Sequence, residues 1–214
     1  MDSIVDRESL SGAAAATEPR VTRNAMIDAM ARALARGGPS GLPWSAIVRE
    51  AESSSLWRSG PWFGDVPALV EECYARTARA LEQCLLRAET APGTALDQVA
   101  AFLVAAFELR RDRTALLALQ PPEGMPPTQC KRLREWDLAI RMRIKRLLLK
   151  GRRDGSLALR HADSACAMIL ACLQVPLAHT NAAEQQMWDG ELIELLLAAI
   201  AEPHPQEGGG RRAV

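Results

Sequence analysis

Residues 43–70 read PWSAIVREAESSSLWRSGPWFGDVPALV, and this stretch decides the fold. Apolar residues at positions 44, 47, 48 and 51 recur at the spacing of one helix face, which predicts a helix over residues 44–51. Three serines at 53–55 then interrupt the apolar pattern, and their hydroxyl groups can accept hydrogen bonds from the first amides of a second, short helix. Two short helices around a tight turn form a helix-turn-helix.

The end of the stretch carries the signals for the next helix. Gly64 is a helix stop, Asp65 is a candidate N-cap, and Pro67 suits the first turn of a long helix expected over residues 67–88. Gly60-Pro61 falls inside the second short helix. A proline there removes an amide donor and clashes with the preceding turn, at a cost of about 3 kcal/mol or more. The second short helix is therefore expected to be shortened, kinked or shifted in register.

The same stretch resembles the DNA-binding domain of the tetracycline-repressor (TetR) family. Apolar, serine and aromatic residues follow in the order of that family's pattern, namely Ile47-Val48, Ala51, Ser54 or Ser55, Trp62-Phe63, Gly64-Asp65 and Ala68-Leu69-Val70. The resemblance implies that the second short helix reads the major groove of duplex DNA. The DNA-binding residues that it implies are Arg20, Arg23, Ser45, Ser53, Ser54, Ser55, Trp57, Arg58 and Trp62, with Arg20 and Arg23 on phosphates. The alternative for the two arginines is solvated charge on an amphipathic helix.

Several features depart from the family pattern. Glu52 stands at the turn glycine, Val66 stands at the basic residue that touches phosphate, and one residue is inserted between Ala51 and Phe63. Residues 18–70 hold six cations against five carboxylates, whereas duplex binding gains much of its affinity from neutralised phosphates. An alternative therefore stays open: a TetR-like helical scaffold that has lost specific DNA binding and acts through a protein partner or a small ligand.

The rest of the chain predicts an all-α fold. Apolar residues at helical spacing indicate helices over residues 21–35, 67–88, 94–110, 128–150 and 187–200, with a short helix near 116–119 and a helix-breaking loop at 121–127. A second similarity to the TetR family lies in Asp154-Gly155-Ser156-Leu157 and His161-Ala162-Asp163-Ser164, which resemble the turn and cap before that family's dimerisation helices. It implies a homodimer formed through the last two helices, which are the apolar helix that follows Ser164 and the helix over residues 187–200.

The expected organisation is a helix-turn-helix module on a larger helical domain. Residues 1–19 would be a disordered arm, 20–66 the DNA-binding module, 67–202 the ligand-binding and dimerisation domain, and 203–214 a disordered tail. In the resembled family the larger domain encloses a cavity for a small-molecule effector. Aromatic or soft residues that could line it are Cys73, Tyr74, Phe102, Phe107, Met125 and Trp136, although each also fits simple core packing.

Composition excludes several other classes of protein. The formal net charge is zero, the first residues lack a signal-peptide pattern, and the longest apolar run, 165–173, is too short to span a bilayer. Five cysteines without a C-x-x-C pair suggest neither disulfides nor a metal site, and a cytoplasmic protein is expected. No nucleophile, phosphate loop or histidine pair indicates an enzyme, and no cofactor is expected.

One charged segment has two interpretations. Residues 131–153 hold ten cations against two carboxylates. Such a run can bind nucleic acid, an anionic ligand or an acidic partner surface. It can equally be a solvated helix face whose cations pair with acidic helices elsewhere in the chain.

Overall fold

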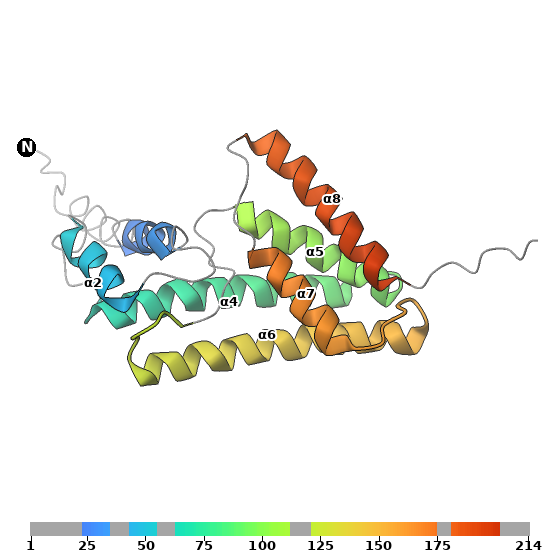
Figure 1. Ribbon diagram of the computed structural model, residues 1–214, viewed down its shortest axis with the longest axis horizontal. Coiled ribbons are helices and arrows are strands. Elements are labelled where there is room, and N and C mark those ends of the chain that lie inside the picture. Colours follow the sequence, from blue (N-terminus) through green and yellow to red (C-terminus); the bar gives the residue numbers. More distant parts are fainter. Residues whose placement is uncertain (1–22, 35–42, 55–62, 112–120, 175–180, 202–214) are drawn as a thin grey trace, which may run out of the picture. The chain divides into compact units, whose positions relative to one another are not determined.

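The structure is a computed structural model that describes residues 23–34, 43–54, 63–111, 121–174 and 181–201. Over these ranges the chain is built from helices joined by turns and loops, and β pairing is limited to one isolated bridge between Leu157 and Ala201. The predicted all-α fold is confirmed (Figure 1).

The helices follow the predicted order. Residues 23–34 are helical, and the further helices are α2 (Trp44–Ser53), α4 (Val66–Thr90), α5 (Ala95–Arg111), α6 (Pro127–Asp154), α7 (Ala162–Gln174) and α8 (Ala182–Ile200). The expected start of the last helix at Met187 is wrong. Asn181 caps α8 instead, because its side-chain oxygen accepts a hydrogen bond from the Ala183 amide at 3.0 Å. The short helices expected after residue 55 and near 116–119 lie outside the described residues.

The chain divides into two compact units, and both α4 and α6 contribute residues to each. The first unit comprises residues 1–79 and 110–137, and the second comprises residues 80–109 and 138–214. Each unit has its own buried apolar residues. In the first these include Met26, Ile27, Met30, Ile47, Ala51, Leu69, Val70 and Leu133, and in the second Leu81, Leu85, Phe102, Leu103, Phe107, Ile140, Ile144, Leu148, Ile169 and Ile200.

In the second unit, the start of α5 is capped from two directions. Thr94 and Asp97 form a reciprocal capping box: the Thr94 amide donates to the Asp97 carboxylate at 2.7 Å, and the Asp97 amide donates to the Thr94 hydroxyl at 3.3 Å. The turn after α6 supplies two further hydrogen-bond acceptors for the first amides of α5. The Asp154 carboxylate accepts from the Ala95 amide and the Ser156 hydroxyl accepts from the Leu96 amide, each at 3.2 Å.

These hydrogen bonds stabilise the ionised carboxylates. The pKa of Asp97 is lowered mainly by hydrogen bonds from Thr94, and the pKa of Asp154 is lowered mainly by hydrogen bonds from Ser156. The Asp154-Gly155-Ser156 turn, which carries part of the TetR resemblance, therefore has a structural role as a cap for a distant helix.

Gly151 allows the C-terminal part of α6 to pack closely against the following segment. A Cβ atom at this position would lie 2.3 Å from Cδ1 of Leu157 and 3.2 Å from Cβ of Ala95. The Leu157 amide also donates to the Gly151 carbonyl at 3.0 Å. Any larger residue must therefore displace the buried Leu157 side chain.

None of the helices in the described part of the chain combines the length and the apolar character that crossing a membrane requires.

Candidate nucleic-acid interface

Helix α2, which would open the helix-turn-helix, is held at its N-terminus by the loop before α6. The Trp44 amide donates to the Glu123 carbonyl at 2.9 Å, and Gly124 in this loop has a φ of +83°. Only glycine adopts this backbone conformation freely, and a Cβ atom at Gly124 would lie 3.3 Å from Cβ of Trp44. Ile47 and Ala51 are buried, which orients α2 so that Ser45 and Glu52 remain exposed.

The start of α4 confirms the predicted cap. Asp65 lies just before Val66, the first residue of the helix, and its carboxylate accepts a hydrogen bond from the Ala68 amide at 2.8 Å. This satisfies one of the free amides of the first turn, and the negative charge also suits the positive end of the helix dipole. Pro67 follows in the first turn, where its missing amide proton costs nothing.

Arg23 is the predicted phosphate contact that the structure describes. Its guanidinium lies over the ring of Phe63, 4.9 Å from the centroid, and within 3.9 Å of the Glu72 carboxylate on α4. The side chain keeps 42% of its surface exposed. Arg23 is therefore positioned by an aromatic ring and a carboxylate while part of its guanidinium still faces water.

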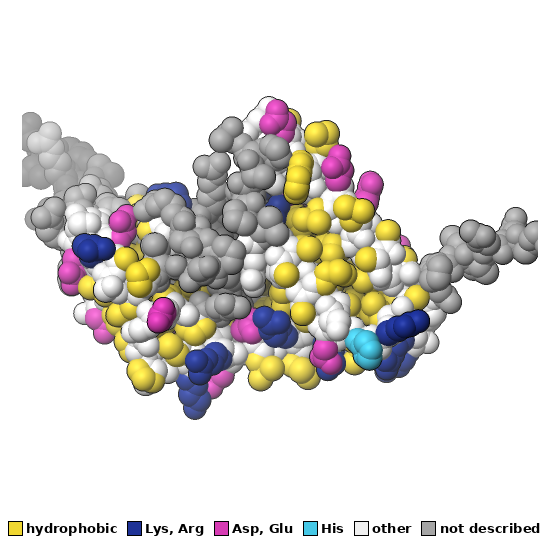
Figure 2. Space-filling model, in the orientation of Figure 1, with side chains coloured by type: hydrophobic (Ala, Val, Ile, Leu, Met, Phe, Trp, Pro, Cys, Tyr) yellow, Lys and Arg dark blue, Asp and Glu magenta, His cyan; other side chains and the backbone are white. Residues whose placement is uncertain are grey.

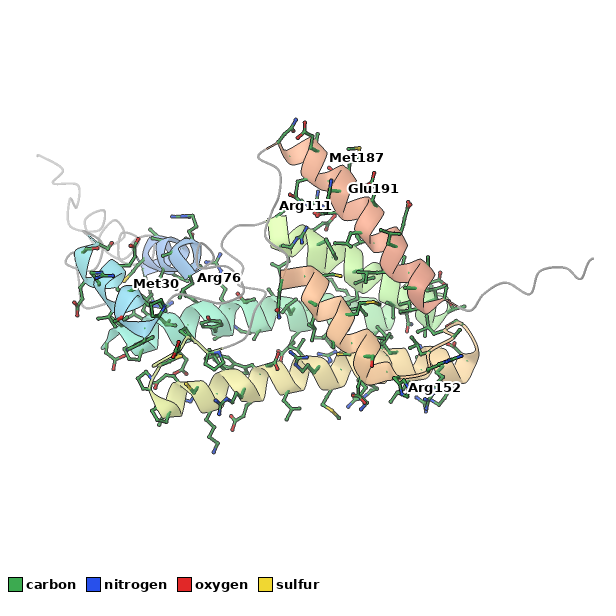
Figure 3. All side chains as sticks on the ribbon, in the orientation of Figure 1. Met30, Arg76, Arg111, Arg152, Met187 and Glu191 are labelled. Atoms are coloured by element: carbon green, nitrogen blue, oxygen red, sulfur yellow. The ribbon has the colours of Figure 1, made fainter. Side chains whose placement is uncertain are left out.

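Further contacts fasten the helix at residues 23–34 to the N-terminal part of α4. Asp28 pairs with Arg76, whose side chain is labelled in Figure 3, and the buried Cys73 thiol donates to the Ile27 carbonyl at 3.5 Å. Glu72 pairs with Arg79 at 2.8 Å in addition to Arg23. Glu71 pairs with Arg132 of α6, which lies in the same unit.

Sequence reasoning missed this network. Periodicity defined the faces of the two helices but not which helices would meet. The available signal was the charge spacing along α4, where Glu72, Arg76 and Arg79 recur at intervals of four and three residues on one helix side.

The remaining predicted DNA-binding residues divide into two groups. In the described part, Ser45 is exposed in the first turn of α2, the Ser53 hydroxyl donates to the Glu50 carbonyl at 3.0 Å, and Ser54 is the C-cap of α2. Arg20, Ser55, Trp57, Arg58 and Trp62 lie outside the described residues. The DNA-reading role of both groups stays a prediction.

The structure describes the surroundings of two residues, Val66 and Glu52, that depart from the family pattern. Val66 is buried, with 6% of its surface exposed, so it has no route to a DNA phosphate. Glu52 is exposed near the end of α2, where it places a negative charge close to the predicted reading segment. Neither residue supplies the positive charge that binding to DNA phosphates would require.

The six residues predicted to line an effector cavity are distributed over both units. Cys73, Tyr74, Met125 and Trp136 belong to the first unit, and Phe102 and Phe107 belong to the second. All are buried except Trp136, which is half-buried. Their part in ligand binding stays a prediction.

Burial controls the ionisation of two of these side chains. It is the main reason that the pKa of Cys73 is raised to about 12, with the nearby Glu72 carboxylate adding to the effect. Burial also raises the pKa of the Tyr74 hydroxyl. Neither side chain therefore ionises near neutral pH, and Cys73 has no reactive thiolate there.

Helices α7 and α8 pack against each other, and α8 carries large exposed apolar side chains. On α8, Met187 and Leu195 keep 60% and 68% of their surface exposed, and Trp188 is also exposed. Figure 2 shows hydrophobic side chains gathered over the region of these two helices. A contiguous patch of large exposed apolar residues is a candidate surface for binding another molecule.

The whole fold matches solved structures of transcriptional regulators. A TetR-family regulator from Agrobacterium tumefaciens aligns with a TM-score of 0.62 and 16% identity over 86% of this chain and 100% of that chain. A regulatory protein of the same family from Rhodococcus RHA1 gives a TM-score of 0.60 and 14% identity, over 85% and 98%. The ketosteroid transcriptional regulator KstR2 of Mycobacterium tuberculosis gives 0.59 and 15%, over 85% and 95%.

By sequence alone, no protein-family model and no curated protein matches. The structural likeness nevertheless extends over nearly the full length of each neighbour, and the neighbours are transcriptional regulators rather than enzymes. Together with the all-α architecture and the family-like order of motifs, this assigns to the chain the fold of the TetR-family transcriptional regulators.

Proposed function

We propose that the chain is a dimeric transcriptional repressor that binds duplex DNA through residues 20–66 and releases it when a small effector binds the larger helical domain, residues 67–202. The observation that carries the proposal is the near-complete coverage of solved TetR-family regulators by this fold. The cytoplasm is the compartment in which such a protein acts.

The contacts around Arg23 support a DNA-binding role. A guanidinium stacked on Phe63 and paired with Glu72 is held in one place before DNA arrives, so binding costs less conformational entropy. Phe63 is also the first described residue after the expected reading helix. The phosphate contact of Arg23 would therefore form close to the bases that this helix reads.

The contacts between α4 and the helix at residues 23–34 support regulation. Two ion pairs and the hydrogen bond from Cys73 join these helices, so a displacement of α4 would carry the preceding module with it. An effector that prefers one position of α4 would shift the balance between two spacings of the DNA-reading modules in a dimer. One structural neighbour is described as a gamma-butyrolactone receptor and another as a ketosteroid regulator, which favours an organic effector.

The exposed apolar surface of α8 supports a homodimer. Burying Met187, Trp188 and Leu195 against a second copy would remove large apolar area from water and pair the two copies by a two-fold axis. Two identical modules would then contact two half-sites. The near-neutral charge of each module makes this doubling of phosphate contacts necessary for useful affinity.

The test is duplex DNA binding over a salt series, with the purified full-length protein and sites selected from a random pool. We expect a site-specific complex whose affinity falls steeply with salt. Arg23→Gln should reduce the slope of log affinity against log salt by about 0.9 for each phosphate that is no longer neutralised, or about 1.8 for a dimer. The matched control is Arg134→Gln, which removes an exposed cation of α6 and should leave the slope unchanged.

The thermal unfolding midpoint of each variant is measured as well. An unchanged midpoint means that a smaller slope reflects a lost phosphate contact, whereas a lower midpoint means that the substitution has destabilised the fold. Equal slopes for the Arg23 and Arg134 variants would remove Arg23 from the DNA surface. Failure of the wild-type protein to form any specific complex at low salt would contradict the proposal, and a TetR-like scaffold without DNA binding would replace it.

A further inference from the structure

The exposed side of α6 in the second unit carries apolar and cationic side chains along one stripe of the helix. Leu138, Met142, Lys145, Leu149 and Arg152 follow one another at intervals of four, three, four and three residues, which is the spacing of the contact seam in a coiled coil. We call these five residues the α6 seam. Leu138 and Met142 keep 60% and 52% of their surface exposed, so the seam is uncovered.

An open groove of about 410 Å³ lies along the C-terminal part of the seam, from Met142 onward. The side chains that line it are Met142, Lys145, Arg146, Leu149, Arg152 and Arg153. Two apolar side chains and four cations line it, and each apolar side chain is followed by two cations. The site therefore offers apolar contact and positive charge together.

The charged residues of this α6 segment all have the same sign. Residues 138–153 include seven cations and no carboxylate. Three of the cations already have partners in the second unit: Arg143 with Glu89 at 2.7 Å, Lys145 with Asp163 at 2.6 Å and Lys150 with the Gln98 amide oxygen at 2.8 Å.

Arg146 and Arg152 differ from these three. Both are exposed, and neither forms an ion pair with any residue in the described ranges. Figure 3 labels Arg152 on the C-terminal part of α6, and Figure 2 shows Lys and Arg side chains gathered there. These two guanidinium groups flank Leu149 by three residues on each side. They are therefore available to carboxylates on a molecule that contacts Leu149.

We propose that the α6 seam and its flanking cations form a docking site for an acidic amphipathic helix of a partner protein. Apolar residues of that helix would pack on Leu138, Met142 and Leu149, and its flanking carboxylates would pair with Arg146 and Arg152. The proposal goes beyond DNA binding and does not depend on it.

The apolar part of the seam distinguishes this partner from nucleic acid. A phosphate backbone would use the cations but would leave Leu138 and Met142 in water or against sugars. A second α6 is a poorer partner than an acidic helix, because a symmetric pair would place Arg146 and Arg152 of one copy near the same cations of the other. Like charges opposed in this way repel, whereas carboxylates at the same positions attract.

The test uses the full-length protein and a fluorescent three-heptad peptide with leucines along one seam and glutamates on both flanks. Repulsion between its glutamates keeps the peptide from pairing with itself near neutral pH. Fluorescence anisotropy should show saturable binding that weakens with salt but persists at high salt, because apolar contact is not screened. A peptide of identical composition, with its leucines moved off one helix side, should bind at least about tenfold more weakly.

Two surface variants locate the site. R146E/R152E should weaken peptide binding at least about tenfold, and Met142→Ser should weaken it while leaving the charge unchanged. The matched control is K131E/R134E, which makes the same charge change at exposed positions in the N-terminal part of α6 and should retain binding. All of the substituted side chains are exposed, and an unchanged thermal unfolding midpoint verifies the fold of each variant.

Several results would overturn the proposal. Equal binding of the two peptides would show that the surface binds anions without recognising an apolar helix face. Absence of peptide binding would show that α6 has no such docking site. Stronger binding of duplex DNA, or of phosphatidylserine vesicles, that is abolished in R146E/R152E would assign the surface to that other molecule. Growth of the protein beyond a dimer, abolished by the same variant, would make a second copy the occupant.

Discussion

The Cys73 thiol lies in the core of the first unit, where its burial gives a testable pH dependence. The pKa of the folded thiol is raised to about 12 from an ordinary value of 9.0, mainly by burial. Below about pH 9 the thiol is protonated in the folded and the unfolded chain. As the pH rises from 9 toward 12, only the unfolded chain loses the proton, so the free energy of unfolding falls.

We therefore expect Cys73 to lower stability by up to about 1.4 kcal/mol per pH unit in this window. The measurement is urea unfolding at several pH values between about 8 and 10. Cys73→Ala should lose this share of the pH dependence, and Cys130→Ala, which keeps Cys73, should retain it. An identical alkaline loss in Cys73→Ala and in the wild-type protein would show that the thiol does not contribute.

At the scale of single elements, a substitution at Gly151 tests how closely α6 packs against Leu157. Gly151→Ala places a Cβ atom 2.3 Å from Cδ1 of Leu157, and such overpacking costs about 1–3 kcal/mol. The higher helix propensity of alanine offsets at most about 1 kcal/mol of this cost. We expect a net loss of about 1–2 kcal/mol in the free energy of unfolding, measured by urea denaturation.

Gly190 provides the matched control for this substitution. It also lies inside a helix, but a Cβ atom there would meet nothing within 4 Å in the described structure. Gly190→Ala should therefore stabilise the chain by up to about 1 kcal/mol, at the same protein concentration. If both alanines stabilise the protein, Leu157 moves aside without cost and the close packing at Gly151 is unimportant.

Local signals predicted the helices well where periodicity and caps agreed. Asp65 before Pro67 located the start of α4, because one carboxylate and one proline are enough to define a helix N-terminus. The start of α8 was missed because residues 182–186, AAEQQ, have no apolar periodicity. The signal that could have found it was Asn181, a good N-cap residue.

The candidate sites were less predictable than the helices. The pairing of Asp28 with Arg76 and the capping of Ala95 by Asp154 join residues 48 and 59 positions apart. Periodicity identifies the face of a helix but not the element that this face meets. The resemblance to TetR regulators supplied the order of the helices, whereas the contacts that fasten Arg23 required the structure.

At the scale of the whole molecule, the exposed apolar residues of α8 and α6 belong to two different proposed interfaces. Leu195 on α8 would be buried against a second copy, and Leu138 on α6 would be buried against an acidic partner helix. The two side chains are similarly exposed, at 68% and 60%. The same substitution at each position therefore separates dimerisation from docking.

Leu195→Glu should dissociate the dimer. A carboxylate buried in an apolar interface without a partner costs several kcal/mol, and the two-fold axis applies this cost twice. We expect dimer affinity to fall at least about a hundredfold, measured by sedimentation equilibrium over a concentration series. DNA affinity should fall with it, because one module then contacts one half-site.

Leu138→Glu should have the opposite profile. It leaves the dimer and its DNA complex intact, because α6 lies outside the proposed dimer surface, but it weakens binding of the acidic peptide by adding a like charge to the seam. Loss of the dimer in Leu138→Glu, with Leu195→Glu unaffected, would exchange the roles of the two surfaces. A dimer that survives both substitutions would exclude Leu195 of α8 from the interface, and another surface of the chain would then have to pair the two DNA-reading modules.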